Sequence, residues 1–324
     1  MQVDVVLISY NQEQYIAQAL ESILMQRVDE DVQVRVIVAD DCSKDKTLEI
    51  IKSYEDKSSF PFVYLPAEKN MGIAANYKRA YAATEAEYVA VLEGDDWWTD
   101  ANRLQKHIDY LSTHTDCVLT KNNYMRYNQR TKEWTIDVSR YQILTLRQTL
   151  NDYMLANMSS TVFRGTYLRN MDNRVFQFGY KQRDEATDFY AHIYLLQFGY
   201  GFVLNDVMSI YRVETGSNVS IDDRTNEEHI SKAYMCYLQS WDLLGDNYKN
   251  ECFGIYKATL DFIERDKRNI LLQRYSNYIP PIFARFIVVI MPKIWHLCKY
   301  IIRQSIPNNI YKKLHNGKNT ESIS

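Results

Sequence analysis

Short runs of β-branched and other apolar residues alternate with amphipathic segments along residues 1–125. The strand-like runs are VDVVLIS, VRVIVAD, FVYL, YVAVLE and CVLTKNN, and the helix-like segments between them are NQEQYIAQALESILMQ, DKTLEIIKSYE, GIAANYKRAYAAT and ANRLQKHIDYLSTH. Apolar strands separated by helices of this length are typical of a mostly parallel sheet flanked by helices. The sequence therefore predicts an α/β fold.

The pattern becomes less regular after residue 140. Helix-like TLRQTLNDYMLA and TDFYAHIYLLQFG and strand-like MSIYRV lie between residues 140 and 215, and helical patterns dominate from about residue 222. A chain of 324 residues, 46% of them hydrophobic, can bury one large core or two modest ones. We expect a main domain over residues 1–220 and a helical C-terminal extension over residues 221–324.

The net charge of −3 is unevenly distributed along the chain. Residues 267–320 hold ten Lys and Arg residues and no acidic residue, which leaves 28 basic and 41 acidic residues elsewhere, a net of −13. An acidic main body argues against nucleic acid as its partner. The five cysteines form no CxxC pair, and the sequence shows neither a signal-peptide layout nor an apolar run that could span a bilayer. These features favour a reduced, cytoplasmic protein.

A basic amphipathic pattern lies within the extension. In a helix over residues 282–303, one face is apolar and the opposite face carries basic residues, among them Arg285, Lys299 and Arg303. Such a helix can lie in a membrane interface, attracted by anionic lipid, or it can pack its apolar stripe on the main domain. The first interpretation places the protein peripherally on the inner face of the cell membrane.

Polar residues follow three of the predicted strands, at the point where each strand ends. They are Ser9 to Asn11 after the first strand, Asp40 to Ser43 after the second, and Glu93 to Asp96 after the fourth. Ligands of open parallel sheets bind beyond the carboxyl ends of the strands. We therefore expect these three segments to form one site.

Three carboxylates stand together in VLEGDDWW. Glu93 and Asp95 are two residues apart, so both point to the same face if the strand continues that far. Paired carboxylates at this position suit Mg²⁺ or Mn²⁺, which takes further ligands from water and from a phosphate-bearing substrate. The alternative is a plain turn in which Asp96 or Asp100 caps the helix that follows.

The other two strand ends offer groups that suit a nucleotide. Tyr10 presents an aromatic face, and Asp40 and Asp41 present acceptors for the N–H of a pyrimidine. Each has a structural alternative, because Tyr10 can pack in a core and Asp40 to Ser43 can form a helix-capping turn. Together they indicate a nucleotide pocket.

VVLISYNQEQYIAQALESILMQ, VRVIVADDCSKDKTLEII and NMGIAANYKRAYAATEAEYVAVLEGDDWW follow one another in this order. Over roughly the first 110 residues, this arrangement resembles the inverting family 2 nucleotide-sugar glycosyltransferases. The resemblance implies their A-type, Rossmann-like fold, with residues 1–110 binding the nucleotide-sugar and residues 111–220 forming the acceptor side. It also implies that Tyr10 stacks on the base and Asp41 binds it.

The resemblance also bears on the metal. It implies that Asp95 takes the place of the metal-binding acid in the family's DxD motif, whereas Glu93 replaces the first Asp. Glutamate is one methylene longer and can instead reach the ribose or a metal-bound water. The full set of residues that we assign to donor binding is Ser9, Tyr10, Asn11, Glu13, Asp41, Asn76, Glu93, Gly94 and Asp95.

Inverting transfer needs a base that takes the proton of the acceptor hydroxyl. In the resembling family it is an acid at the start of a helix, and Asp188 in QRDEATDFYAHIYLLQFG fits best, with Asp184 and Glu185 as alternatives. Arg212 can neutralise leaving-group charge or form a structural ion pair. Glu214 stands where relatives often carry a histidine.

The acceptor side is assigned to Asp96, Trp97 and Trp98, because the family places its sugar-binding floor after the metal motif. An aromatic face can stack on a sugar ring, although one of the two tryptophans can equally belong to the core. The pocket formed by Tyr10 and Asp41 predicts a UDP-sugar donor, and the resemblance alone predicts a lipid-linked glycan acceptor.

Two other classes of function have to be weighed. A metal-dependent nucleotidyltransferase needs phosphate-cradling glycines and a lysine near the first strand, and LISYNQEQY has neither. A non-catalytic nucleotide-sugar-binding scaffold needs no base, yet Asp41, Asp95 and Asp188 are all present.

Overall fold

The computed structural model describes residues 1–151, 156–177, 187–213, 215, 236, 239–248 and 251–252. The chain divides into two units, residues 1–259 and residues 260–324, and all described residues belong to the first unit. The helix expected over residues 282–303 lies outside the described residues. Within the described part of the chain, no helix combines the length and apolar character needed to cross a bilayer.

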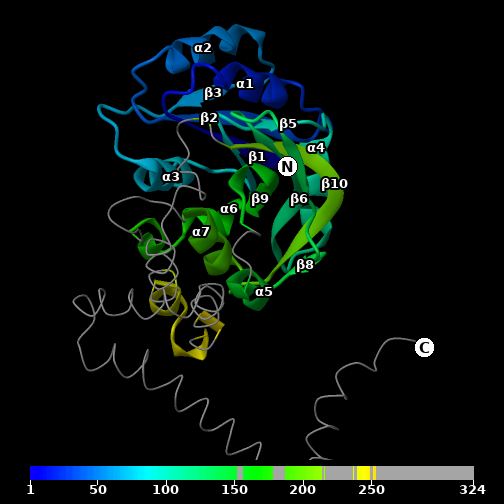
Figure 1. Ribbon diagram of the computed structural model, residues 1–324. Coiled ribbons are helices and arrows are strands. Elements are labelled where there is room, and N and C mark those ends of the chain that lie inside the picture. Colours follow the sequence, from blue (N-terminus) through cyan, green and yellow to red (C-terminus); the bar gives the residue numbers. More distant parts are fainter. Residues whose placement is uncertain are drawn as a thin grey trace, which may run out of the picture. The chain divides into compact units, whose positions relative to one another are not determined.

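A ten-stranded sheet, with strand order β3-β2-β1-β4-β9-β6-β10-β5, forms the centre of the described unit, and β7 and β8 pair with β6 and β10 (Figure 1). The strands are β1 (Gln2–Ser9), β2 (Gln33–Asp40), β3 (Phe62–Tyr64), β4 (Tyr88–Glu93), β5 (Trp97–Trp98), β6 (Cys117–Asn128), β7 (Trp134–Asp137), β8 (Ile143–Leu144), β9 (Thr161–Arg164) and β10 (Tyr200–Val213). The expected α/β class is confirmed.

Seven α-helices are described: α1 (Ile16–Leu24), α2 (Thr47–Ser53), α3 (Ile73–Ala82), α4 (Arg103–Thr113), α5 (Leu146–Asn151), α6 (Gly165–Arg169) and α7 (Thr187–Leu195). Short 3₁₀ turns include Met158–Ser160 and Asn173–Phe176. Helices α1 and α2 lie on one side of the sheet and α3 on the other (Figure 1).

Strand β1 shows why helices cover both faces of the sheet. All its residues after Gln2 are buried, so it has no solvent-exposed face, as expected for a central parallel strand. Val3, Val5 and Leu7 share a core cluster with the apolar stripes of α1 and α4. The intervening residues face the opposite side, where α3 contacts β1 and β2.

The parallel pattern holds for only part of the sheet. The neighbouring strands from β3 to β4 are parallel, as are β6 and β10, but β9 is inserted antiparallel between β4 and β6. Because β9 is antiparallel to both of its neighbours, β4 and β6 run in the same direction. The carboxyl ends of β1, β2, β4, β6 and β10 therefore lie toward one edge of the sheet.

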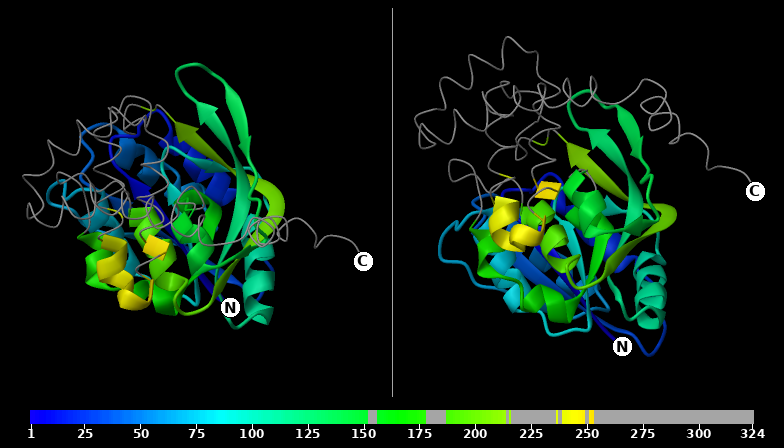
Figure 2. Two further views of the ribbon diagram at one scale, coloured as in Figure 1. Left: turned by 60° about the horizontal axis from the view of Figure 1, so that its bottom comes forward. Right: turned by 90° about the horizontal axis from the view of Figure 1, so that it is seen from below.

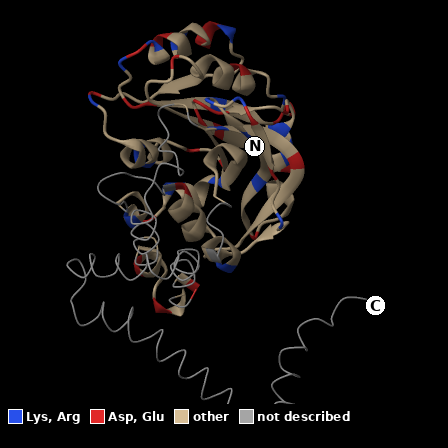
Figure 3. Cartoon of the chain, in the orientation of Figure 1, with Lys and Arg blue, Asp and Glu red and all other residues tan. Residues whose placement is uncertain are grey.

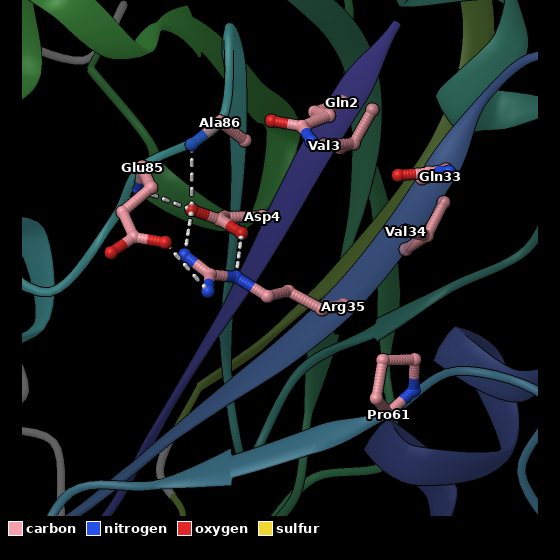
Figure 4. Close-up of a pocket in the computed structure, with 9 residues that line it drawn as sticks. All are labelled: Gln2, Val3, Asp4, Gln33, Val34, Arg35, Pro61, Glu85 and Ala86. Carbon is pink, nitrogen blue, oxygen red and sulfur yellow. Dashed lines mark hydrogen bonds and ion pairs between the residues drawn. The ribbon is translucent and has the colours of Figure 1, made fainter.

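The opposite edge carries a pocket of about 170 Å³ around Asp4 and Arg35 (Figure 4). Asp4 is 1% exposed and accepts four hydrogen bonds: from Arg35 Nε (2.5 Å) and Nη2 (3.1 Å), and from the backbone N–H groups of Glu85 (2.7 Å) and Ala86 (3.0 Å). The hydrogen bond that Arg35 donates to Asp4 raises the pKa of Arg35. The charged groups of Asp4 and Arg35 are thus paired with each other and with the segment before β4. We interpret them as a structural link between β1, β2 and the start of β4.

We expect Asp4→Ala to lower the free energy of unfolding by about 3 kcal/mol, because the Arg35 guanidinium and two backbone N–H groups would lose their acceptor. Denaturant titration of the purified protein measures this change. Glu85→Gln is the matched control: Glu85 also contacts Arg35, at 3.0 Å, but its side chain is 78% exposed. We expect the control to change stability by less than about 0.5 kcal/mol. Equal losses in the two variants would contradict the bracing role of Asp4.

Candidate active site

The three polar strand ends meet at the carboxyl edge of the sheet. The register pairs Ser9 with Asp40 and Ile8 with Glu93, so β1, β2 and β4 end side by side. The Ser9 hydroxyl donates to Asp40 Oδ2 at 2.9 Å. The sequence therefore placed these strand ends together correctly.

The acidic turn, residues 93–96, leaves β4 and crosses directly over α1. The N–H of Gly94 donates to the carbonyl of Ile8 at 2.8 Å. A Cβ at residue 94 would lie 2.7 Å from Ile16 Cδ1 and would also overlap the Gln12 side chain. Glycine is thus favoured at residue 94, because a Cβ there would displace the ends of both side chains and come within 3.2 Å of the Ile8 carbonyl oxygen.

Glu93 sits among groups that hold its carboxylate in place. Its Oε1 accepts a hydrogen bond from the Tyr77 hydroxyl at 2.6 Å, and its N–H donates to Ser159 Oγ at 3.2 Å. Removal from water, followed by repulsion from Asp95 and Asp188, raises the pKa of Glu93 to about 7, although the Tyr77 hydrogen bond opposes this shift. The carboxylates are therefore close enough to destabilise one another's charge.

Asp95 and Asp96 differ in their surroundings. Asp95 Oδ2 accepts from the Thr215 hydroxyl at 3.1 Å, and Asp95 is 4% exposed. Asp96 is 1% exposed, and its Oδ1 accepts from the backbone N–H of Arg212 at 2.8 Å. Burial, then repulsion from Asp95 and Glu93, raises the pKa of Asp96 well above its ordinary value. The structure thus uses Asp96 to hold β10 against the turn and does not place it at an acceptor surface.

Arg212 fixes the acidic turn from the side of β10. Its Nε donates to the Asp95 carbonyl at 2.8 Å, and its two terminal nitrogens donate to side-chain oxygens of Gln129 (3.0 Å) and Gln18 (2.6 Å). The guanidinium lies 4.5 Å from the ring centroid of Trp97. Arg212 is 6% exposed, so its role in this structure is architectural. Glu214 lies outside the described residues.

The loop after β1 carries several of the residues expected to bind the donor. Tyr10 is 36% exposed, which leaves its ring accessible for stacking. Asn11 adopts φ 51°, a left-handed conformation that asparagine tolerates better than most residues, and its Oδ1 accepts from the N–H of Lys44 at 2.8 Å. Glu13 Oε2 accepts from the N–H of Lys46 at 2.9 Å. Asn11 and Glu13 therefore tie the β1 loop to the β2 loop.

Asp41 and Asn76 also hold loops in place. Asp41 is 2% exposed, and its two carboxylate oxygens accept from the N–H groups of Met71 and Gly72, both at 2.9 Å. Gly72 has φ 87°, so this turn favours glycine. Asn76 donates to the carbonyl of Ala39 at 2.7 Å and accepts from Arg79 Nε at 2.8 Å. A carboxylate can accept more than two hydrogen bonds, so Asp41 still has lone pairs for a further donor. Its contact with the base stays a prediction.

The two tryptophans have separate environments. Trp98 is 1% exposed, its Nε1 donates to the carbonyl of Ser159 at 2.8 Å, and the Arg103 guanidinium lies 4.3 Å from its ring centroid. Trp98 therefore belongs to the core and not to an acceptor floor. Trp97 is partly exposed and contacts Tyr127 and Trp134 at ring-centroid distances of 6.3 and 6.2 Å.

Asp188 lies in the first turn of α7. Its Oδ1 accepts from the N–H of Phe189 at 2.8 Å, and its carbonyl is bonded to His192 Nδ1 at 2.7 Å. Its charge contributes to the raised pKa values of Glu93 and Tyr211, so it lies within electrostatic range of the acidic turn. The fold thus brings Asp188 to the site from almost a hundred residues away in sequence. Asp184 and Glu185 lie outside the described residues.

The donor atoms at the acidic turn fit a divalent cation. Glu93 and Asp95 supply carboxylate oxygens, and the raised pKa of Glu93 reflects its burial first and then the negative charges of Asp95 and Asp188, which a cation would offset. Across the described ranges, no group of three or more His, Cys, Asp or Glu residues is arranged to hold a metal. A cation at this pair would therefore need oxygen ligands from water and substrate.

Three site contacts were not anticipated from sequence. Tyr77 and Ser159 bond Glu93, and Thr215 bonds Asp95. Tyr77 could have been suspected, since α3 leads back toward β4 and this tyrosine lies on its apolar stripe. Ser159 and Thr215 lie 66 and 120 residues from their partners and carry no local signal.

Comparison with protein families gives a match to the glycosyl transferase family 2 model over residues 4–174, which is more than half of the chain. The chain belongs to this family. An uncharacterised protein of Mycobacterium tuberculosis is 42% identical over 114 residues, which are 35% of this chain and 32% of that protein. The putative teichuronic acid biosynthesis glycosyltransferase TuaG of Bacillus subtilis is 34% identical over 110 residues, 34% of this chain and 41% of TuaG. The matched segment thus spans about a third of the mycobacterial relatives' length.

Solved structures support the same fold. The Staphylococcus aureus TarS fragment 1–349 in complex with UDP aligns with a TM-score of 0.58 at 19% identity, covering 80% of this chain and 71% of that one. A mannosyltransferase from Pyrobaculum calidifontis, in complex with GDP-Man and Mn²⁺, aligns with a TM-score of 0.54 at 14% identity, covering 90% and 79%. The A-type glycosyltransferase fold expected from the sequence is confirmed.

Proposed function

We propose that the chain is an inverting hexosyltransferase that moves a sugar from a UDP-sugar to a glycan acceptor in surface polysaccharide biosynthesis. The observation that carries the proposal is the convergence of Glu93, Asp95 and Asp188 at the carboxyl edge of the sheet, where their charges perturb one another. One relative is named for teichuronic acid biosynthesis, and TarS has been solved with UDP and with UDP-GlcNAc. Those names support the choice of donor and pathway.

In this proposal each part of the site has one task. Tyr10 stacks on the base, and Asp41 accepts a base N–H with its remaining lone pairs. Glu93 and Asp95 hold Mg²⁺ or Mn²⁺, which would neutralise charge on the leaving diphosphate. Asp188 removes the proton of the acceptor hydroxyl while the nucleoside diphosphate leaves from the opposite face of the sugar carbon. Tyr77 and Ser159 keep Glu93 in position.

The rival classes are less well supported. A nucleotidyltransferase would need a phosphate-cradling glycine loop after β1, whereas the loop there consists of Tyr10 and Asn11 followed by glutamine and glutamate. A non-catalytic scaffold has no use for Asp188 close to the acidic turn. Slow hydrolysis of the donor sugar by the purified protein would exclude the scaffold.

The acceptor and the location are further parts of the proposal. We propose a lipid-linked acceptor and a cytoplasmic enzyme at the inner face of the membrane, attached through the basic helix expected over residues 282–303. Deletion of residues 279–324 tests this attachment, because it should reduce sedimentation of the protein with anionic vesicles at low salt.

We expect UDP-sugar binding and turnover to need a divalent cation. A thermal-shift screen of UDP-, GDP- and TDP-sugars, with and without Mn²⁺, should show the largest rise in melting temperature for a UDP-sugar with Mn²⁺, because ligand bound to the folded state stabilises it by mass action. Turnover should fall at least about tenfold in saturating chelator and return on adding Mn²⁺. Activity unchanged by chelator would refute the metal requirement, and a larger shift with GDP-sugars would refute the choice of donor.

A further inference from the structure

Strands β6 and β7 form a hairpin that extends beyond the rest of the sheet (Figure 2). It continues past the carboxyl edge, because β6 runs in the same direction as β4, and its turn lies between Asn128 and Trp134. The hairpin therefore projects from the same edge at which the acidic turn lies.

The two faces of the hairpin differ in chemistry. The inner face carries Tyr124, Arg126 and Asp137, with Arg126 bonded to Asp137 at 2.9 Å and Tyr124 in edge contact with Tyr211. Tyr211 lies within electrostatic range of the carboxylates of Glu93, Asp96, Asp188 and Asp95. The inner face thus looks toward the site.

The outer face is apolar and partly open to solvent, and its Trp134 also contacts Trp97, with ring centroids 6.2 Å apart. Trp134, Ile136 and Val138 alternate along the chain, as residues on one face of a strand do, and are 50%, 63% and 57% exposed. The register sets Trp134 opposite Tyr127, and their ring centroids are 4.5 Å apart. The large apolar side chains of Trp134 and Ile136 on β7, and of Val138 directly after it, form an exposed apolar patch.

Basic residues border this patch. Arg130 and Lys132 lie at the hairpin turn and Arg140 lies beyond β7, whereas Arg126 is paired with Asp137 on the inner face. Residues 126–140 carry a net charge of +2, although the chain outside residues 267–320 is strongly acidic. Charges of both signs are spread over the described unit as a whole (Figure 3). The positive hairpin is thus a local exception.

We propose that the outer face of the β6–β7 hairpin, with Trp134, Ile136 and Val138, docks on an anionic lipid surface. Tryptophan beside aliphatic side chains suits the membrane–water interface, and Arg130 and Lys132 at the turn suit anionic headgroups. Docking through this face would bring the acidic turn close to the membrane surface, because Trp134 contacts Trp97, which directly follows that turn. The proposal concerns a different surface from the basic helix expected over residues 282–303, and it holds whatever sugar the enzyme transfers.

A protein partner fits the patch less well. Three half-exposed side chains present on the order of 300 Å² of apolar surface, well below the roughly 800 Å² that each partner buries in a stable complex. Symmetric pairing with a second copy would bring the basic turns of two hairpins together, which like charges oppose. A lipid surface needs no minimum interface area and has the complementary charge.

Sedimentation with vesicles tests the proposal on the full chain. The vesicles are phosphatidylcholine alone, or phosphatidylcholine mixed with phosphatidylglycerol, at low and high salt. We expect binding to the mixed vesicles and a loss of at least about tenfold in Trp134→Ser/Ile136→Ser, because membrane affinity follows buried apolar area. The single variant Ile136→Ser is compared with Val63→Ser as its matched control. Val63 is also aliphatic, is 37% exposed, and lies on β3 at the other end of the sheet. The control should bind within about twofold of the parent.

Charge is tested separately. Arg130→Gln/Lys132→Asn should weaken binding at low salt several-fold, whereas Lys52→Gln/Lys57→Gln, two exposed lysines near α2, should not. Asparagine is chosen for residue 132 because Lys132 has φ 62°, a conformation that asparagine tolerates. Unchanged melting temperatures would show that the variants fold.

Several results would overturn the proposal. Absence of binding to anionic vesicles by the full chain is one, and equal losses in the control variants is another. Binding that survives every hairpin variant but disappears on deleting residues 279–324 would assign docking to the C-terminal segment alone. A fall in molar mass by light scattering in the hairpin variants, with vesicle binding unchanged, would make the patch an interface between copies.

Discussion

Asp188→Asn should lower kcat by about 10² or more and leave donor binding unchanged, because it removes a proton acceptor that acts only in the transition state. Asparagine has nearly the same shape, and its Oδ1 can still accept from the N–H of Phe189 as Asp188 does. The helix loses one favourable N-terminal charge, at a cost of about 0.5 kcal/mol, which is too small to unfold the domain. Steady-state kinetics together with calorimetric titration of UDP separate the two effects.

The controls for this prediction come from the neighbouring acids. Asp184→Asn and Glu185→Gln should retain turnover within a few-fold if Asp188 is the base. Normal turnover in Asp188→Asn, with a large loss in one of the other two variants, would move the base to that residue. Loss of UDP binding in Asp188→Asn would show that the residue supports the donor pocket and not proton transfer.

The nucleotide half of the fold could be read from sequence because its signals are local. The strands β1, β2 and β4 are buried on both faces, so each appears as a mostly apolar run, interrupted within β1 and β2 only by the paired Asp4 and Arg35. Helices α1, α3 and α4 appear as apolar stripes beside them. Polar residues directly after such runs fall at the carboxyl edge. This rule placed Ser9, Asp40 and Glu93 together without any knowledge of distant contacts.

The second half of the sheet could not be predicted in this way. Strand β9 has only four residues and is inserted between β4 and β6, and β10 extends over 14 residues through register shifts where only MSIYRV carried a strand signal. Pairings of this kind are decided by long-range packing, which a sequence window does not contain. The β6–β7 hairpin was missed as well, because most of β7 is exposed and its sequence carries no apolar run.

Among the site residues, chemistry was easier to predict than burial. The sequence grouped Glu93, Asp95 and Asp188, and the charges of Asp95 and Asp188 do act on Glu93 in the structure. It did not show that Trp98 and Asp96 are buried. Their burial depends on Arg103, Ser159 and Arg212, which approach from α4, a 3₁₀ turn and β10. Adjacent residues in a tight turn can face opposite directions, and only the surrounding elements determine which one is buried.

Asp95→Asn should act on the donor complex instead of on proton transfer. The substitution keeps an oxygen that can accept from the Thr215 hydroxyl, and the Asp95 carbonyl still accepts from Arg212 Nε. It removes one of two carboxylates proposed to hold the cation, so Mn²⁺-dependent UDP affinity should fall by about 10² or more, with little change in UDP binding measured in chelator. Calorimetric titration of UDP with and without Mn²⁺ measures both quantities.

The stability of the metal-free protein gives an independent check, because Asp95→Asn should weaken UDP binding but should not lower stability. Repulsion from Asp95 helps to raise the pKa of Glu93 to about 7, from an ordinary value of 4.5. A carboxyl whose pKa is higher in the folded than in the unfolded state stabilises the fold fully below about pH 4.5 and loses that contribution as the pH rises through about 7. Removing the charge of Asp95 lowers the pKa of Glu93 in the folded state, so less stability is lost as the pH rises. In chelator at pH 8, Asp95→Asn should therefore unfold at the same denaturant concentration as the parent protein or at a higher one. Asp206→Asn is the control: it removes an exposed carboxylate that is paired with Lys106, so it should not gain stability. A destabilised Asp95→Asn protein that still binds UDP with Mn²⁺ would show that Asp95 is a structural residue of the turn and not a ligand.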